Sequence, residues 1–178
     1  MATIGREGRG VLKTALITVP AIVIVGTLMG YLSNSGFSNS WYAGLTKPAF
    51  QPPAWAFGVV WTILYALMGI ALAMVLNEPP SQRRSNALWL FGGQLALNFA
   101  WSPVFFGMQM IDVALVIILV MLFMATAAAN LFRRIRKLAG WLLLPYLAWL
   151  CLATALNYGT GRLNPGADSA PMGITGAE

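Results

Sequence analysis

The segment WYAGLTKPAFQPPAWAFGVVW, residues 41–61, decides how the chain can fold. It lies between the first two long apolar stretches, and its three prolines, Pro48, Pro52 and Pro53, fix backbone φ angles and remove hydrogen-bond donors. A continuous helix is therefore excluded here. The aromatic side chains of the segment need apolar cover with their polar tips satisfied. Two interpretations follow: a rigid lid over a binding site, or an aromatic belt at a membrane interface.

The composition indicates a membrane protein. Of 178 residues, 58% are hydrophobic and only 9% are charged, and the mean hydropathy is +0.72. An average soluble domain carries roughly 25% charged residues. The chain contains no histidine, which excludes histidine-ligated haem, histidine metal sites and histidine general bases. We therefore predict no metal site, and the single cysteine, Cys151, excludes an internal disulfide.

Five apolar stretches are each long enough to cross a hydrocarbon core of about 30 Å. They cover approximately residues 13–32, 54–76, 86–107, 113–132 and 138–158. The sequence thus predicts an all-α, integral membrane bundle of five transmembrane helices, which forms a single domain over residues 1–164. The remaining tail, residues 165–178, is rich in Gly and Pro and lacks periodicity, so we expect it to be disordered.

The basic residues are distributed unevenly between the two sides of a five-span topology. Nine of the eleven fall on the side of the N-terminus: Arg6, Arg9, Lys13, Arg83, Arg84, Arg133, Arg134, Arg136 and Lys137. Only Lys47 and Arg162 fall on the other side. This bias predicts a cytoplasmic N-terminus, with the C-terminus and the 41–61 segment on the opposite side. The net charge of +6 is then a topology signal, and nucleic-acid binding is a poor explanation of it.

No ionisable side chain falls near the middle of a predicted span, which argues against a proton-coupled transporter. The polar groups in the spans are neutral, and Gln94, Asn98 and Ser102 lie four residues apart on one helix face. Interhelical hydrogen bonding would explain them structurally. The aromatic and amide residues that we expect in the leaflet nearest the 41–61 segment are Trp61, Tyr65, Asn98, Trp101, Tyr146 and Trp149. Such a group suits a large, flat, mostly apolar ligand.

Four segments carry a family resemblance. They read, in chain order, WYAGLTKPAFQPP, AWAFGVVWTILYALMG, GQLALNFAWSPVFFG and PYLAWLCLATALNY. Together they resemble the translocator protein family, also called TspO/MBR, tryptophan-rich sensory proteins or peripheral-type benzodiazepine receptors. The resemblance covers approximately residues 26–164 and implies a five-helix bundle, often a homodimer, without a covalently bound cofactor.

The resemblance also implies a ligand and a site. Family members bind porphyrins such as protoporphyrin IX, and eukaryotic members bind sterols; they are linked to transport, to receptor functions and to stress sensing. The ligand-binding positions that transfer to this chain are Gly26, Trp41, Trp61, Tyr65, Asn98, Trp101, Trp149, Ala153 and Leu156. A possible sterol motif is formed by Leu156, Tyr158 and Arg162. Since this pattern is weak, interfacial anchoring by Tyr158 and Arg162 is the alternative.

The residues and the resemblance together predict a membrane protein that binds porphyrins, and possibly sterols. Its predicted role is that of a carrier or sensor in tetrapyrrole or stress regulation. The alternative is an enzyme that degrades porphyrin photo-oxidatively with the help of tryptophan. No general acid–base pair or nucleophile lies in the spans, so we predict no catalytic residue for hydrolysis or group transfer. A third possibility is a regulator whose porphyrin occupancy alters its contacts with other proteins.

Overall fold

The computed structural model describes the backbone of residues 2–176 and the side chains of residues 8–176, so the Arg6 side chain lies outside the described part. The described chain is helical and contains no strand, which confirms the all-α prediction. Its elements are α1 (Ala2–Leu32), α2 (Ser40–Gly44), α3 (Ala54–Leu76), α4 (Gln82–Ser102), the π-helical turn η1 (Pro103–Gly107), α5 (Ile111–Ile135), α6 (Lys137–Trp141) and α7 (Leu144–Leu163).

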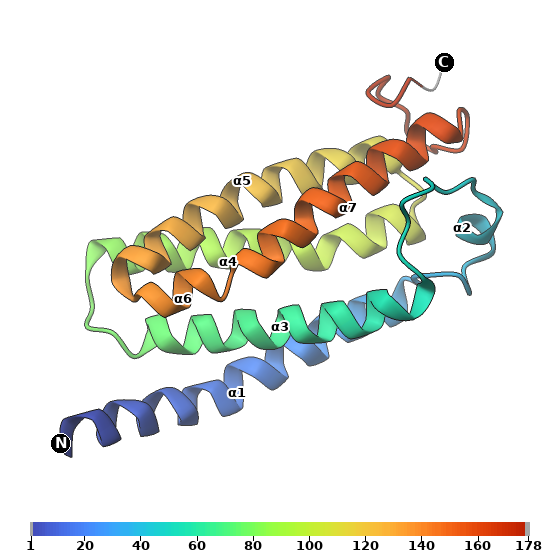
Figure 1. Ribbon diagram of the computed structural model, residues 1–178. Helices are drawn as coiled ribbons and strands as arrows, with labels where there is room; N and C mark the ends of the chain where they lie inside the picture. Colours follow the sequence, from blue (N-terminus) through green and yellow to red (C-terminus); the bar gives the residue numbers. More distant parts are fainter. Residues whose placement is uncertain (1, 177–178) are drawn as a thin grey trace.

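Within the described residues, four helical segments are long and apolar enough to cross a membrane. They are Gly8–Leu32, Ala54–Leu76, Ile111–Ile135 and Lys137–Leu163, and Figure 1 shows the long helices running side by side as a bundle. An integral, multi-pass membrane bundle is therefore confirmed, but the predicted count of five spans is not. The difference is α4, whose first turns are polar and whose apolar stretch is interrupted by Gln94 and Asn98.

Prolines mark the ends of two helices. The sequence predicts one span over residues 86–107, but α4 ends at Ser102 and the chain continues from Pro103 as η1. The predicted span 138–158 is divided as well, since α6 ends at Trp141 and α7 begins at Leu144. Pro145 lies in the first turn of α7, where a missing N–H group leaves no hydrogen bond unmade.

The core lies between α3, α4, α5 and α7. Phe91 of α4 stacks on Phe132 of α5 with ring centroids 5.3 Å apart, and both side chains are buried. Helix α1 packs on the outside of this group, mainly against α3 (Figure 1). The contact is close, because Thr18 Oγ1 donates a hydrogen bond of 2.8 Å to the carbonyl oxygen of Gly69. A glycine at 69 lets the two backbones approach, as small residues do between membrane helices.

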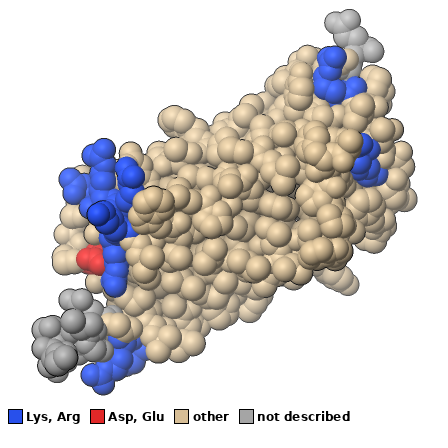
Figure 2. All heavy atoms as spheres, in the orientation of Figure 1, with Lys and Arg blue, Asp and Glu red and all other residues tan. Residues whose placement is uncertain are grey.

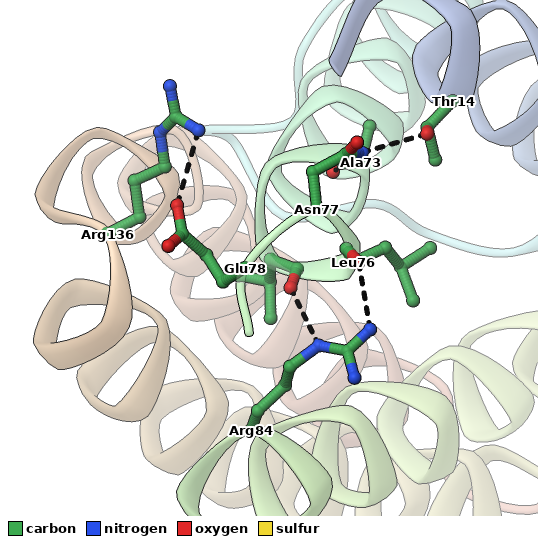
Figure 3. A network of polar contacts seen from close by, with 8 residues as sticks. Thr14, Ala73, Leu76, Asn77, Glu78, Arg84 and Arg136 are labelled. Carbon is green, nitrogen blue, oxygen red and sulfur yellow. Dashed lines mark hydrogen bonds and ion pairs between the residues drawn. The ribbon is translucent and has the colours of Figure 1, made fainter. Parts of the chain in front are cut away.

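One end of the bundle is basic and stabilised by polar contacts. On the face drawn in Figure 2, most Lys and Arg atoms gather at this end. Arg84 donates from Nε to the Val75 carbonyl (3.0 Å) and from Nη2 to the Leu76 carbonyl (2.8 Å), and so caps the C-terminus of α3 (Figure 3). Arg136 forms an ion pair of 3.3 Å with Glu78. Arg84 and Arg136 therefore connect the helices in addition to setting the charge bias.

The tail differs from the disorder that we predicted for it. Residues 165–176 form no helix, yet they lie against the end of the bundle opposite the basic end (Figure 1). The carboxylate of Asp112 accepts hydrogen bonds from the backbone N–H groups of Met172, Ile174 and Thr175. The tail is therefore ordered by hydrogen bonds from its backbone to a carboxylate that is distant in sequence. Such bonds leave no periodic pattern in the sequence of the tail. Residues 177–178 lie outside the described part.

Candidate functional site

A cavity of about 670 Å³ lies within the bundle, at the end where the α1–α3 loop connects the helices. Residues of α1, α3, α4, α5 and α7 line it, together with loop residues 34–38. Among the described lining residues there is no charged side chain. Its volume is within the range of about 300–1,000 Å³ that is typical of small-molecule sites.

Aromatic side chains form one wall. Phe57, Trp61 and Tyr65 are four residues apart in α3, so the helical repeat places them on one face. The Trp61 ring lies 5.2 Å from the Tyr65 ring at an interplanar angle of 32°, and 6.3 Å from the Trp149 ring at 84°. Phe57 also contacts Trp149, at 5.7 Å. Helices α3 and α7 thus present a continuous aromatic surface to the cavity.

A chain of neutral hydrogen bonds supports this wall from inside the bundle. Tyr65 donates to Asn98 Oδ1 (2.9 Å), Asn98 Nδ2 donates to the Tyr146 hydroxyl (3.2 Å), and Tyr146 donates to Gln94 Oε1 (2.7 Å). All four side chains are buried. Because unpaired polar groups are costly in an apolar interior, these hydrogen bonds hold the Tyr65 ring in position. They also keep α3, α4 and α7 in register.

We expect Tyr146→Phe to lower the free energy of unfolding by about 1–2 kcal/mol, because Gln94 and Asn98 each lose a buried partner. Unfolding in detergent, followed by circular dichroism, measures the effect. Tyr158→Phe is the matched control, since Tyr158 is 46% exposed. Equal stability of the two variants would show that the hydrogen-bond chain contributes nothing.

Gly26 provides the space that the Tyr65 ring occupies. A Cβ atom at position 26 would lie 2.2 Å from Tyr65 Cε2 and 2.4 Å from its Cζ, far inside van der Waals contact. The small residue of α1 therefore acts through Tyr65: any larger side chain displaces the ring and changes the shape of the cavity.

The loop between α1 and α3 closes one end of the cavity and is held by internal hydrogen bonds. Asn39 caps α2 by accepting from the Tyr42 N–H (3.1 Å), and Gln51 Nε2 donates to the Tyr42 hydroxyl (2.8 Å). The Lys47 ammonium donates to the carbonyls of Tyr42, Ala43 (3.1 Å) and Leu45 (2.7 Å). Burial lowers the pKa of Lys47. With three carbonyl partners, this cation stabilises the loop.

Three buried polar atoms of cavity-lining residues lack a hydrogen-bond partner within the described chain. They are Trp101 Nε1, Ser102 Oγ and Asn157 Oδ1. Asn157 uses its other amide atom, Nδ2, to donate to the Ile111 carbonyl (2.9 Å), which leaves the oxygen as a spare acceptor. Since these three atoms are themselves buried, their residues line the cavity through other atoms.

Most of the predicted site residues come together around this cavity. Those that line it are Gly26, Trp61, Tyr65, Asn98, Trp101, Trp149, Ala153 and Leu156. Trp41 is not among the lining residues: its ring contacts Phe105 at 5.6 Å and its Nε1 donates to the Ala167 carbonyl (3.3 Å). The possible sterol motif is divided, since Leu156 is buried whereas Tyr158 and Arg162 are exposed.

The structure adds lining residues that the sequence pattern does not predict. Tyr42, Gln51, Phe57 and Asn157 all line the cavity. Phe57 could have been found from its spacing, since it lies one helical turn before Trp61. Tyr42 directly follows Trp41, and only the loop conformation decides which of the two rings faces the cavity.

Fold and site together define the class: an all-helical, multi-pass membrane protein with an uncharged, aromatic internal cavity. The model of the TspO/MBR family matches residues 17–163, and the chain belongs to this family. It is 41% identical over 155 residues to the translocator protein of Sus scrofa, covering 83% of this chain and 92% of the relative.

Two further relatives show how widely the similarity extends. The translocator protein of Homo sapiens is 41% identical over 144 residues, which cover 80% of this chain and 85% of the relative. The tryptophan-rich sensory protein of Cereibacter sphaeroides is 40% identical over 126 residues, which cover 71% and 78% of the two chains. The chain therefore resembles mammalian and bacterial members to a similar degree.

Proposed function

We propose that this protein binds porphyrins of the protoporphyrin IX type in the cavity and acts as a carrier or sensor in tetrapyrrole or stress regulation. The observation that carries the proposal is the uncharged cavity of about 670 Å³ whose wall is built from Trp61, Tyr65 and Trp149. Flat aromatic macrocycles gain both apolar burial and ring contacts on such a surface.

The chemistry of the lining favours metal-free porphyrin over haem. The chain has no histidine to serve as an axial ligand. Sterols, which are apolar apart from one hydroxyl, are the second ligand class that the cavity suits.

The test is a parallel titration of the detergent-solubilised protein with protoporphyrin IX and with cholesterol. We expect saturable quenching of tryptophan fluorescence by protoporphyrin IX, because several indoles lie at the cavity. Quenching that rises linearly without saturation, or that free tryptophan reproduces, would exclude a porphyrin site. Saturable displacement of the porphyrin by cholesterol would extend the proposal to sterols.

A second candidate function is photo-oxidative breakdown of porphyrin. It is favoured by the contact of Trp61 with both Tyr65 and Trp149, because indole and phenol side chains can donate electrons to a photoexcited ring while dissolved oxygen serves as the oxidant. Loss of porphyrin absorbance under light, faster with protein than without it, would support this activity. Equal rates would leave binding as the function.

We further propose that α4 is the fifth span, with the N-terminus in the cytoplasm. In the structure α4 runs along α5 for much of the bundle, and its Gln94 and Asn98 side chains are buried (Figure 1). Single cysteines at Ser85→Cys and Met108→Cys, made in a Cys151→Ser background, should react with impermeant reagents from opposite sides. Labelling from the same side would show that α4 does not cross.

The resemblance also implies a homodimer. We propose this oligomeric state, which a mass measurement of the detergent-solubilised protein tests directly. A monomer at all concentrations examined would contradict it.

A further inference from the structure

Residues 165–176, here called the strap, run across the end of the bundle that carries the α1–α3 loop (Figure 1). Their sequence is PGADSAPMGITG, and several of these residues form hydrogen bonds with distant parts of the chain. The strap therefore has a defined position without being helical.

Asp112, in the first turn of α5, is the main anchor of the strap on the bundle. Its Oδ2 accepts from the N–H groups of Met172 (2.8 Å) and Ile174 (3.1 Å), and its Oδ1 accepts from that of Thr175 (3.2 Å). Asp112 is fully buried, and Thr175 is 1% exposed. Hydrogen bonds to a carboxylate are stronger than neutral ones, so this single side chain fixes three residues of the strap.

A second carboxylate completes the attachment. Asp168 Oδ2 accepts from the backbone N–H of Asp112 (2.7 Å), and its Oδ1 accepts from that of Ala170 (2.9 Å). Ser169 donates from its N–H to the Gln109 carbonyl (3.0 Å) and from Oγ to the Met108 carbonyl (2.6 Å). The strap is thus joined to the turn between η1 and α5 from both directions.

The other side of the strap holds the loop. Trp41 Nε1 donates to the Ala167 carbonyl at 3.3 Å. Just before the strap, Asn164 pairs with Thr46 twice: its Oδ1 accepts from the Thr46 N–H (2.7 Å) and its Nδ2 donates to the Thr46 carbonyl (2.8 Å). The Trp41–Ala167 hydrogen bond therefore connects the strap itself to the loop, and the Asn164–Thr46 pair holds the same loop at the adjoining end of α7.

We propose that the strap holds the α1–α3 loop closed over the cavity, and that Asp112 is the positioning residue for this lid although it does not line the cavity itself. Trp41 contributes through the same contact: it ties the lid to the strap instead of touching the ligand. The part that concerns ligand exchange rests on the proposed porphyrin-binding function, whereas the coupling of strap and loop does not.

The coupling is tested by hydrogen exchange on the full-length protein without ligand. In Asp112→Asn, which keeps only one acceptor oxygen, we expect exchange to become about tenfold faster in the strap and in loop residues 41–47. Glu78→Gln, which removes a carboxylate at the opposite end, should leave both segments unchanged. Faster exchange in the strap alone would overturn the proposal, as would unchanged exchange in the strap.

Asp168→Asn provides a second variant in case Asp112→Asn fails to fold, since Asp112 also belongs to α5. It removes one of the two carboxylate oxygens that accept from the N–H groups of Asp112 and Ala170, and it leaves the Asp112 side chain unchanged. We again expect faster hydrogen exchange in both the strap and the loop, with smaller increases than in Asp112→Asn. Faster exchange in the strap with unchanged exchange in the loop would again overturn the coupling.

Ligand exchange is then followed by stopped-flow with protoporphyrin IX. We expect Asp112→Asn to raise the association and dissociation rate constants together by about tenfold, with less than a threefold change in Kd, because a lid affects entry and exit equally. Unchanged rate constants would overturn the lid. If protoporphyrin IX fails to bind the unmodified protein, the proposed function fails, while the hydrogen-exchange result still decides the coupling.

Discussion

Replacing Trp61 and Trp149 together with leucine is expected to raise the Kd for protoporphyrin IX by roughly 5- to 150-fold. Each ring contact contributes about 0.5–1.5 kcal/mol beyond its buried area, and 1.4 kcal/mol corresponds to a factor of ten. Both indoles line the cavity, and their ring centroids lie 6.3 Å apart. The shift of the porphyrin absorbance band measures binding without depending on the indoles that are removed.

The control for this experiment is Trp89→Leu. Trp89 is 76% exposed on α4 and does not line the cavity, so its loss should leave the Kd unchanged. Circular dichroism and elution volume in detergent verify that the double variant is folded. If a folded double variant binds porphyrin with unchanged affinity, the aromatic wall is not the porphyrin site.

Replacing Gly69 with alanine is expected to lower the free energy of unfolding by about 1–3 kcal/mol through overpacking. Helix propensity alone predicts the opposite sign, since alanine is favoured over glycine by about 1 kcal/mol. Packing prevails because a Cβ at position 69 would lie 2.7 Å from the Cα and 2.9 Å from the N of Val19. These are backbone atoms of α1, which cannot move away as a flexible side chain would.

Gly92→Ala is the matched control, because a Cβ at position 92 of α4 would meet nothing within 4 Å. Here propensity should prevail, and stability should rise by up to about 1 kcal/mol. Unfolding in detergent compares both variants with the unmodified protein. A stabilising Gly69→Ala would show that α1 does not approach α3 as closely as the structure places it.

The two glycines of close approach have different consequences for the site. Gly69 sets the distance between α1 and α3, whereas Gly26 admits the Tyr65 ring, which is then fixed by Asn98. The position of α1 therefore determines the aromatic wall without contributing an aromatic side chain. Helix α1 also lines the cavity directly, with Gly26, Thr27, Met29, Gly30 and Tyr31.

The sequence by itself determined the class and the local elements. Apolar stretches of about 20 residues predicted the helices, and α3 begins and ends where the 54–76 stretch was expected. The prolines of residues 41–61 excluded a continuous helix there, and the helix is indeed interrupted over residues 45–53, between α2 and α3. The four-residue spacing of Gln94 and Asn98 placed both on one buried face. These features depend on a residue and its near neighbours in the chain.

Only the tertiary structure decided which groups meet. It paired Tyr65 with Asn98 and Tyr146 with Gln94, directed Trp41 to Ala167 and away from the cavity, and ordered residues 165–176 on Asp112. The physical reason is that such contacts depend on how each helix is rotated and how closely its neighbour approaches. Backbone N–H groups of an aperiodic segment can likewise bind a distant carboxylate without any pattern in their own sequence.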